Sequence, residues 1–379
     1  MRQQLISNAA YHGAAVVLGV IGIVGFVFNA CVIFIMIKDP QLRTPQNLIL
    51  FNLAVSDFAV SLVGNPVTLA AAITKGWIFG QTICVMYGFF MGLFGISSIT
   101  TLSVLAYDRY LMIRYPFSTR RLTNESAIYA IASIWVYAFI VTGPPLFGWS
   151  HYVNESADIS CSVDWESGEY VSYVVFIFLF GFFIPVSIIF YSYINLFITV
   201  KRRASTNSFG QATKAEFRVA IMVVVMIIAF LISWTPYAVL ALLIAFAGVQ
   251  VSPIVSIILA IFAKSSICWN PIIYIGLNTQ FRTAWKRFLK ISNQMEGSKE
   301  GENFTRVSKM IVGKVDSVPS PNSTVEQYDT SPAITHWMAI DERENDSTGP
   351  YMFNLEMCNI CKNKVLDITR PCDIGDVSL

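Results

Sequence analysis

Residues 264–274 read KSSICWNPIIY, and this stretch decides the fold of the 379-residue chain. Its first residue, Lys264, is the single charged residue between Arg218 and Arg282. The other residues of that region are apolar or neutral and form two runs, each long enough to cross a bilayer as a helix. A lysine at the centre of a membrane helix costs about 3 kcal/mol or more. Lys264 therefore requires either a compensating partner or a covalent use.

The composition indicates a protein that crosses the membrane several times. Hydrophobic residues make up 55% of the chain and charged residues 13%, about half of the share of about 25% in soluble domains. The net charge of +2 says little about partners, and we expect no nucleic-acid partner. The seven cysteines are scattered and too few for a fold built on disulfides.

Seven long stretches with few or no charges follow one another, so we predict an all-α membrane protein with a seven-helix bundle in residues 14–290. The predicted spans are 14–38, 47–74, 80–113, 126–149, 170–200, 217–247 and 252–276. A short amphipathic eighth helix is expected at 278–290, where basic residues alternate with apolar ones. Residues 1–13 are expected to be an extracellular N-terminus without a cleavable signal peptide, and residues 291–379 a disordered cytoplasmic tail.

The distribution of charged residues predicts the orientation. Lysines and arginines gather in the connections after the first, third and fifth helices and after the seventh. The connection between the fourth and fifth helices is acidic instead, with Glu155, Asp158, Asp164, Glu166 and Glu169. Basic residues favour the cytoplasmic side, so we expect a plasma-membrane protein with its N-terminus outside and its tail inside the cell.

Polar and proline-containing motifs stand at characteristic places in these helices. The second helix contains Asp57, the third ends in Asp108-Arg109-Tyr110, and the seventh contains Asn270-Pro271-x-x-Tyr274. Further members of the set are Asn29, Trp135, Pro185 and the run from Trp234 to Tyr237. In this order and spacing, the motifs resemble the rhodopsin-like G-protein-coupled receptors.

The same residues predict a conformational switch. Asp57 and Arg109 are ionisable groups at membrane depth, where such groups are functional by default. Arg109 can pair with Asp108, and it can also reach Glu216 at the base of the sixth helix, where similar receptors hold an ionic lock. Pro236 removes a backbone hydrogen bond and kinks that helix. A kinked helix held by an ion pair at its inner end is a candidate two-state element.

Lys264 stands six residues before Asn270, and a lysine at this distance resembles the retinal-binding lysine of animal opsins. The resemblance implies a light-sensing receptor rather than an enzyme. It would bind 11-cis-retinal as a protonated Schiff base, and light would isomerise the retinal to the all-trans form. The resemblance also places a set of aromatic residues and a glycine around retinal, namely Phe178, Phe182, Trp234, Tyr237 and Gly95.

Two cysteines are expected to pair at the outer face. Cys84 opens the third predicted helix and Cys161 lies in the acidic outer loop, so both face the oxidising side. A disulfide between them would close a long loop and contribute on the order of 4 kcal/mol. The run from Cys161 to Trp165 resembles the plug strand of opsins, and the bond would hold this strand over the bundle.

A buried protonated Schiff base requires an anion nearby. Vertebrate visual opsins have a glutamate three residues after the helix-three cysteine, but that position is Tyr87 here. Asp57 is the one carboxylate inside the predicted spans apart from those at their ends, and we expect it in the cytoplasmic half, away from Lys264. Glu155 stands where bistable opsins carry their counterion. We therefore predict Glu155 as the counterion, with Tyr87 beside it as a hydrogen-bond partner.

A counterion at Glu155 has two consequences. It predicts a bistable pigment, whose photoproduct keeps its protonated Schiff base and reverts on absorbing a second photon. It also conflicts with the glycosylation sequon Asn154-Glu155-Ser156, because a glycan would require an exposed loop. We expect Asn154 to be shielded and unmodified.

The cytoplasmic residues suggest a subfamily and partners. Asn278-Thr279-Gln280 resembles the Asn-Lys-Gln tripeptide of ciliary opsins, which favours a non-visual, encephalopsin-like member. Thr279 replaces the lysine, so the class of G protein stays open. The resemblance implies a heterotrimeric G protein as partner, and a receptor kinase and arrestin acting on serines and threonines of the tail.

Two alternatives remain at this point. An opsin-fold retinal photoisomerase would bind all-trans-retinal in the dark and activate G protein poorly. A receptor for a diffusible ligand, with Lys264 incidental, would form no visible chromophore. The Asp108-Arg109-Tyr110 and Asn270-Pro271-x-x-Tyr274 motifs favour a signalling receptor.

Overall fold

The computed structural model describes residues 6–115, 122–168, 171–205 and 211–288, and it describes no side chains at 204–216. The chain divides into two compact units, Met1–Ser308 and Lys309–Leu379. The second unit lies wholly outside the described residues, as does the tail predicted at 291–379. The first unit contains all of the helices and strands discussed below.

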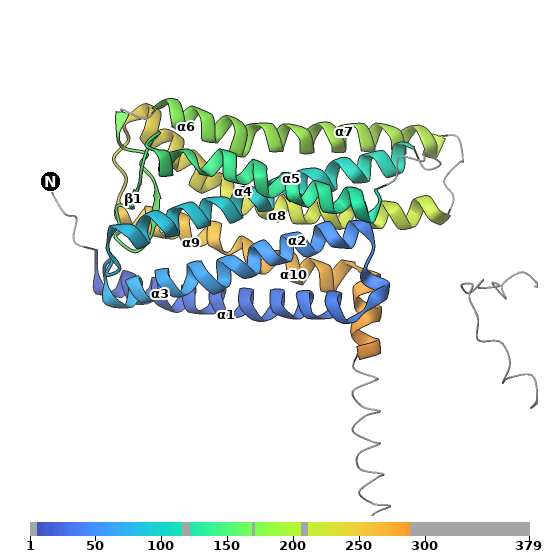
Figure 1. Ribbon diagram of the computed structural model, residues 1–379, viewed down its shortest axis with the longest axis horizontal. Coiled ribbons are helices and arrows are strands. Elements are labelled where there is room, and N and C mark those ends of the chain that lie inside the picture. The colour runs from blue at the N-terminus through green and yellow to red at the C-terminus, as the bar shows by residue number, and fades with distance from the viewer. Residues whose placement is uncertain (1–5, 116–121, 169–170, 206–210, 289–379) are drawn as a thin grey trace, which may run out of the picture. The chain divides into compact units, whose positions relative to one another are not determined.

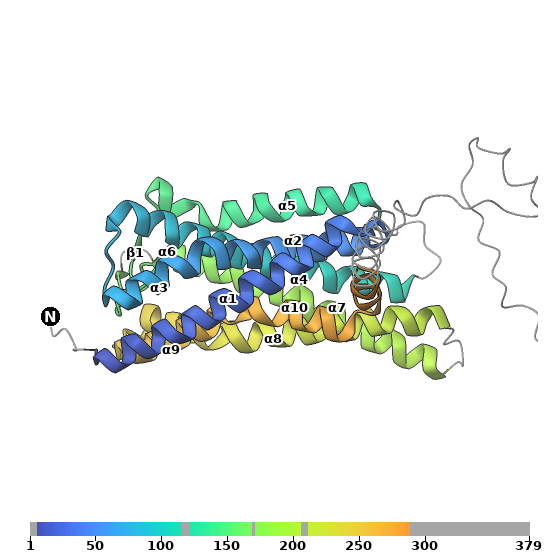
Figure 2. The ribbon, with the colours of Figure 1, turned by 90° about the horizontal axis from the view of Figure 1, so that it is seen from below.

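Seven helical spans of the described residues are long and apolar enough to cross a membrane, which confirms the predicted bundle. They lie side by side, with their ends at the same two ends of the bundle (Figures 1 and 2). Four spans are single helices, namely α1 (Asn8–Lys38), α4 (Gly80–Arg114), α5 (Asn124–Thr142) and α8 (Gln211–Ala247). Three are composite, namely α2 (Pro45–Ala59) with α3 (Asn65–Thr74), α6 (Val171–Phe178) with α7 (Ile184–Ser205), and α9 (Pro253–Lys264) with α10 (Ser266–Leu277).

Prolines explain two of the three interruptions. The π-helical turns η2 (Val60–Gly64) and η5 (Leu179–Phe183) come just before Pro66 and Pro185. A proline has no backbone N–H, and its ring clashes with the carbonyl four residues earlier, so a wider turn accommodates it. The third interruption, between α9 and α10, falls at Ser265, directly after Lys264.

Several helix ends differ from the predicted ones, and two of the differences have a clear local cause. The first helix begins at Asn8 rather than 14, because the hydroxyl of Ser7 accepts a hydrogen bond from the Ala10 amide at 3.3 Å and caps the helix. The fourth span ends at Thr142 rather than 149. Prolines follow it in the short 3-10 helix η3 (Pro144–Phe147), and they cannot continue an α-helix.

A two-stranded hairpin covers one end of the bundle (Figure 1). Its strands β1 (Tyr152–Asn154) and β2 (Cys161–Val163) are antiparallel, with Tyr152 opposite Val163 and Asn154 opposite Cys161. Both strands pack against α4. We call this end of the bundle the plug end.

The opposite end carries the predicted eighth helix, which is described over residues 279–288 and follows α10. It is orange in Figure 1 and turns away from the direction of the bundle. An ion pair between Arg287 Nη2 and Asp39 Oδ2, 2.7 Å long, ties it to the connection after α1. The buried side chains of Phe281 and Ala284 face the main core.

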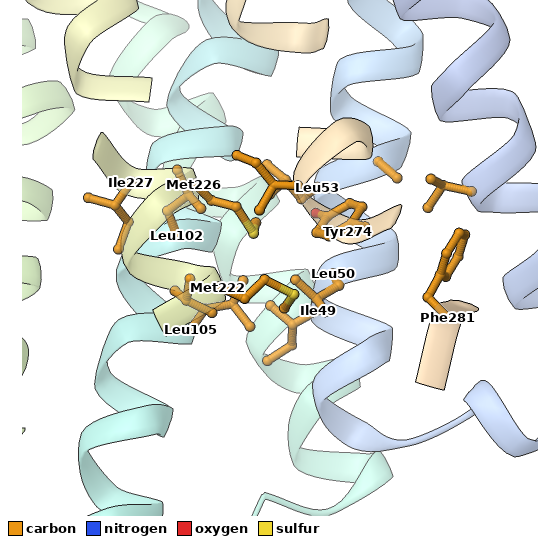
Figure 3. Packing of buried hydrophobic residues seen from close by; sticks show 14 of the residues in the cluster. Ile49, Leu50, Leu53, Leu102, Leu105, Met222, Met226, Ile227, Tyr274 and Phe281 are labelled. Carbon is orange, nitrogen blue, oxygen red and sulfur yellow. The ribbon is translucent and has the colours of Figure 1, made fainter. Parts of the chain in front are cut away.

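That core fills the half of the bundle near the eighth helix (Figure 3). Leu102 and Leu105 of α4 pack against Met222 and Met226 of α8, with Tyr274 of α10 beside them. Unbranched methionines adapt to irregular gaps between such helices. Side chains therefore fill this half, and the cavity described next lies toward the plug end.

Candidate functional site

A cavity of about 180 Å³ lies under the β1–β2 hairpin. Its walls come from α4, α6, η5, α8, α9 and the hairpin, and they are mostly apolar. The apolar lining includes Met91, Ile96, Ile99, Val163, Trp165, Ile177, Phe178, Phe182, Phe230, Trp234, Ala238, Ala241, Ala260 and Ala263. Among the described lining residues, Lys264 is the one cation and Glu155 the one anion. Such a cavity suits an apolar ligand with a single polar or reactive end.

Glycines keep the cavity open between closely packed helices. A Cβ atom at Gly95 would lie 3.4 Å from the indole of Trp234, and one at Gly181 would lie 2.8 Å from the Ile96 side chain. The indole Nε1 of Trp234 donates to Ser266 Oγ at 3.0 Å, which links α8 to α10 at the cavity floor. Gly95, Phe178, Phe182, Trp234 and Tyr237, the residues predicted from sequence, all line the cavity.

Lys264 is the last residue of α9, and its side chain lines the cavity. Its Nζ atom lies 5.5 Å from the centroid of the Tyr87 ring. The carboxylate of Glu155 lines the same cavity. The costly intramembrane lysine thus faces an aromatic ring and a carboxylate inside the protein.

Glu155 follows β1 and points into the cavity. Its Oε1 accepts a hydrogen bond from the Tyr237 hydroxyl at 2.6 Å, and its Oε2 accepts one from Ser160 Oγ. The main chain holds the turn as well, because the Glu155 amide donates to the Ser160 carbonyl at 2.9 Å. Hydrogen bonds therefore fix both carboxylate oxygens, and Glu155 lines the same cavity as Lys264.

Asn154 precedes Glu155, and its Oδ1 lies 2.9 Å from Cys84 Sγ and 3.0 Å from Cys161 Sγ. Its side chain is exposed, and its Nδ2 donates to Asp158 Oδ1 at 2.9 Å. Neighbouring residues of an extended strand face opposite sides, so an exposed Asn154 and an inward Glu155 are compatible. The expectation that Asn154 is shielded is wrong, because it assumed that both residues would share one environment.

Tyr87 differs from its predicted role. Its hydroxyl shares a hydrogen bond of 2.6 Å with Thr68 Oγ1, and Tyr237 is the tyrosine that bonds to Glu155. Tyr87 lies beside Lys264 but has no described hydrogen bond to Glu155. The hydrogen bond expected between Tyr87 and Glu155 is absent among the described residues, because the Tyr87 hydroxyl is already bonded to Thr68 of α3. Tyr237 of α8 donates to Glu155 in its place.

The hairpin is held in place covalently and by hydrogen bonds. The predicted disulfide between Cys84 and Cys161 is confirmed and joins α4 to β2 across 77 residues. On β1, burial raises the pKa of Tyr152, so its hydroxyl stays protonated and donates to the Thr142 carbonyl at 2.7 Å. The hairpin is thereby anchored on α4 and α5, above the cavity.

The predicted switch residues lie in the other half of the bundle. Arg109 is 1% exposed and forms an ion pair with Asp108, as predicted, and Tyr110 follows on α4. The partner expected for Arg109 in the ionic lock, Glu216, has a side chain outside the described residues. The lock therefore stays a prediction.

Asp57 connects the second and seventh helical spans. Its Oδ2 accepts a hydrogen bond from Asn270 Nδ2 at 2.8 Å, and its Oδ1 accepts one from Ser98 at 3.4 Å. Pro271 and Tyr274 are buried one residue and one turn further along α10. The hydrogen bond from Asn270 couples the Asn270-Pro271-x-x-Tyr274 motif to a buried carboxylate.

Sequence reasoning missed several residues of the site. Ser160 and Ser266 fix Glu155 and Trp234, and Phe230 and Tyr152 line the cavity. Ser160 could have been predicted from the sequence, because it directly precedes Cys161 and lies across the turn from Glu155. Ser266 gave no signal, because its partner comes from another helix.

Comparisons with known proteins agree with this geometry. Residues 28–274 match the family described as 7 transmembrane receptor (rhodopsin family). Pinopsin from Gallus gallus is 36% identical over 280 residues, which cover 73% of this chain and 80% of that protein. Rhodopsin from Gallus gallus is 40% identical over 266 residues, covering 69% and 76% of the two chains. The crystal structure of squid rhodopsin matches with a TM-score of 0.71 and 33% identity, covering 76% of this chain and 88% of that one.

The fold and the cavity lined by Lys264 define a seven-helix membrane receptor. The chain belongs to the animal opsins, within the rhodopsin family of seven-transmembrane receptors. The encephalopsin-like subfamily suggested by the sequence stays a prediction.

Proposed function

We propose that this opsin is a light-sensing receptor that binds retinal covalently through Lys264. The observation that carries the proposal is the composition of the cavity wall, in which Lys264 and Glu155 are the one described cation and the one described anion. Retinal is an apolar polyene with an aldehyde at one end, and a primary amine condenses with an aldehyde to a Schiff base. The apolar slot fits the polyene, and Lys264 supplies the amine.

Glu155 would balance the positive charge at Lys264. An anion about 4 Å from a cation contributes about 4 kcal/mol at an effective dielectric constant of about 20. Tyr237 and Ser160 each donate to one carboxylate oxygen, so Glu155 keeps its position. Tyr87 offers its ring face to the same cation.

Bound retinal, in its 11-cis form, would supply a light-driven change of shape inside the cavity. Trp234 lies between the cavity and the core, against Gly95 of α4 and bonded to Ser266 of α10. A displacement of Trp234 would therefore act on α8 and α10 together. Pro236, two residues further along α8, provides a flexible point for the inner part of that helix, next to the buried Arg109–Asp108 pair.

The position of Glu155 supports a bistable pigment. It belongs to the plug hairpin, which the disulfide and Tyr152 anchor independently of α8. The main chain of this hairpin and Ser160 would hold the anion when α8, which contributes Tyr237, moves, so the Schiff base would stay protonated after isomerisation. The photoproduct would then absorb in the visible and return to the dark form with a second photon.

The proposed partner is a heterotrimeric G protein, contacting the bundle end that contains Arg109. Receptor kinase and arrestin would act on the tail, which lies outside the described residues. A photoisomerase would require the same cavity, but it would not require the Asp108-Arg109-Tyr110 and Asn270-Pro271-x-x-Tyr274 motifs, which are expected to serve signalling. We expect that the protein, loaded with 11-cis-retinal, accelerates nucleotide exchange on a G protein in light at least tenfold over dark. Equal exchange in light and dark would favour the photoisomerase.

The proposed orientation can be tested with two identical tripeptides, Asn124-Glu125-Ser126 and Asn154-Glu155-Ser156. They lie at opposite ends of the bundle, and Asn154 is exposed. Glycosylation occurs on the luminal side only, so we expect Asn154 to be modified and Asn124 to stay unmodified. Treatment with an N-glycosidase should increase the gel mobility of wild type and of N124Q but leave N154Q unchanged. A mobility shift that persists in N154Q would contradict this orientation.

A further inference from the structure

Four polar side chains follow one face of the second membrane span, and all of them are buried. They are Asp57, Ser61, Asn65 and Thr68, with exposures of 3%, 3%, 2% and 1%. Their spacing of four, four and three residues places them one above another along the helix. Buried polar groups at membrane depth require partners inside the protein. We call this row the polar stripe.

The two ends of the polar stripe meet functional parts of the molecule. At its inner end, Asp57 accepts the hydrogen bond from Asn270 of α10. At its outer end, Thr68 donates to the Gly64 carbonyl at 3.2 Å, so its oxygen is free to accept from the Tyr87 hydroxyl at 2.6 Å. The ring of Tyr87 faces Lys264. The stripe therefore runs from Asp57 to the side chain that would carry retinal.

Asn65 lies in the middle of the stripe and lacks protein partners. Neither its Nδ2 nor its Oδ1 has a hydrogen-bond partner among the described residues. A carboxamide has two donor hydrogens and an accepting oxygen, and leaving them unpaired in a buried site is costly. The neighbour on α1 is Gly22, where even a Cβ atom would lie 3.7 Å from Nδ2, so the glycine leaves space beside the amide. Buried polar groups of this kind are commonly satisfied by internal water.

We propose that Asn65 binds internal water and that this water joins the two halves of the polar stripe into a hydrated path from Asp57 to Tyr87 and Lys264. The path sets how fast the Schiff-base proton exchanges with solvent, because water reaches the linkage along it. In each exchange one proton leaves the nitrogen for water and another returns, with no net change. The binding of water by Asn65 is inferred from the structure of the chain alone. The effect on Schiff-base proton exchange rests on the proposed function, in which retinal is linked to Lys264.

The water itself is tested in the retinal-free protein. A high-resolution structure of wild type should contain ordered water within hydrogen-bond distance of the Asn65 amide. N65L, which has the same number of side-chain heavy atoms and no polar ones, should lack it, whereas T142V should keep it. Thr142 is a matched buried residue away from the stripe, and its hydroxyl bonds to its own helix at Ala138. A dry Asn65 amide in wild type would overturn the proposal.

The path is tested in the retinal-bound protein through the rate of hydrogen–deuterium exchange at the Schiff base, followed by the C=N stretching frequency in resonance Raman spectra. We expect exchange to be at least tenfold slower in N65L and in T68V than in wild type, and unchanged in T142V. If N65L does not fold, T68V decides the question. Wild-type rates in N65L and T68V would contradict the path. If no Schiff base forms in wild type, the proposed function fails, and the water structure still decides the role of Asn65.

Discussion

K264A loaded with 11-cis-retinal is expected to show no visible absorption band, whereas wild type shows one. Lys264 is the one described cation in the cavity wall, so no other described lining residue can replace its amine. Free retinal absorbs in the near ultraviolet, and only a protonated Schiff base moves the band into the visible. The absorption spectrum of purified protein measures the effect directly, and we expect a loss of at least 95% of the band.

The control for K264A restores the missing amine. Alanine leaves space where the lysine side chain lay, so retinal linked in advance to a small alkylamine can enter the same slot. We expect this adduct to regenerate a visible band in K264A and so to prove that the variant is folded. A visible band in K264A with retinal alone would mean that another group forms the linkage.

E155Q is expected to move the band of the pigment to the near ultraviolet at neutral pH. Removal of the carboxylate that we propose as counterion weakens proton binding by the Schiff base, and a loss of about 4 kcal/mol corresponds to roughly a thousandfold. The proton then leaves at neutral pH, and the visible band should return as the pH is lowered. Absorption spectra between about pH 4 and pH 9 would follow this titration, because that range contains the expected fall of about three units in the pKa of the Schiff base.

The matched control is E166Q, the same substitution at an exposed residue of the same outer connection. It changes the net charge of the connection equally but lies outside the described cavity wall, so its spectrum should equal that of wild type. If E155Q kept a visible band at neutral pH, another anion would be the counterion. The argument for a bistable pigment would then lose its basis.

Hydropathy and motif spacing were sufficient to predict the bundle and the place of Lys264. Both depend on local sequence, since a long uncharged run has few alternatives to a membrane helix. The end of α5 was misplaced by seven residues because apolar residues continue past Thr142, while Gly143 and Pro144 end the helix. A hydropathy scale contains no information on the missing backbone N–H of proline, so it does not predict where the helix ends.

The contacts of the site were harder to predict than its members. Glu155 was found by its distance from Cys161, but its partner Tyr237 lies 82 residues away on another helix. The hydrogen bond between Tyr87 and Thr68 likewise joins two helices. Such pairs depend on how the helices rotate against each other, and a single sequence contains no direct record of that rotation.

The most direct test of the account is the absorption spectrum of wild type with 11-cis-retinal, recorded in the dark, after one flash and after a second flash at longer or shorter wavelength. The account predicts a visible band in the dark, a photoproduct that still absorbs in the visible, and recovery of the dark spectrum after the second flash. Absence of any visible band would contradict the assignment of Lys264 and the role as a light sensor.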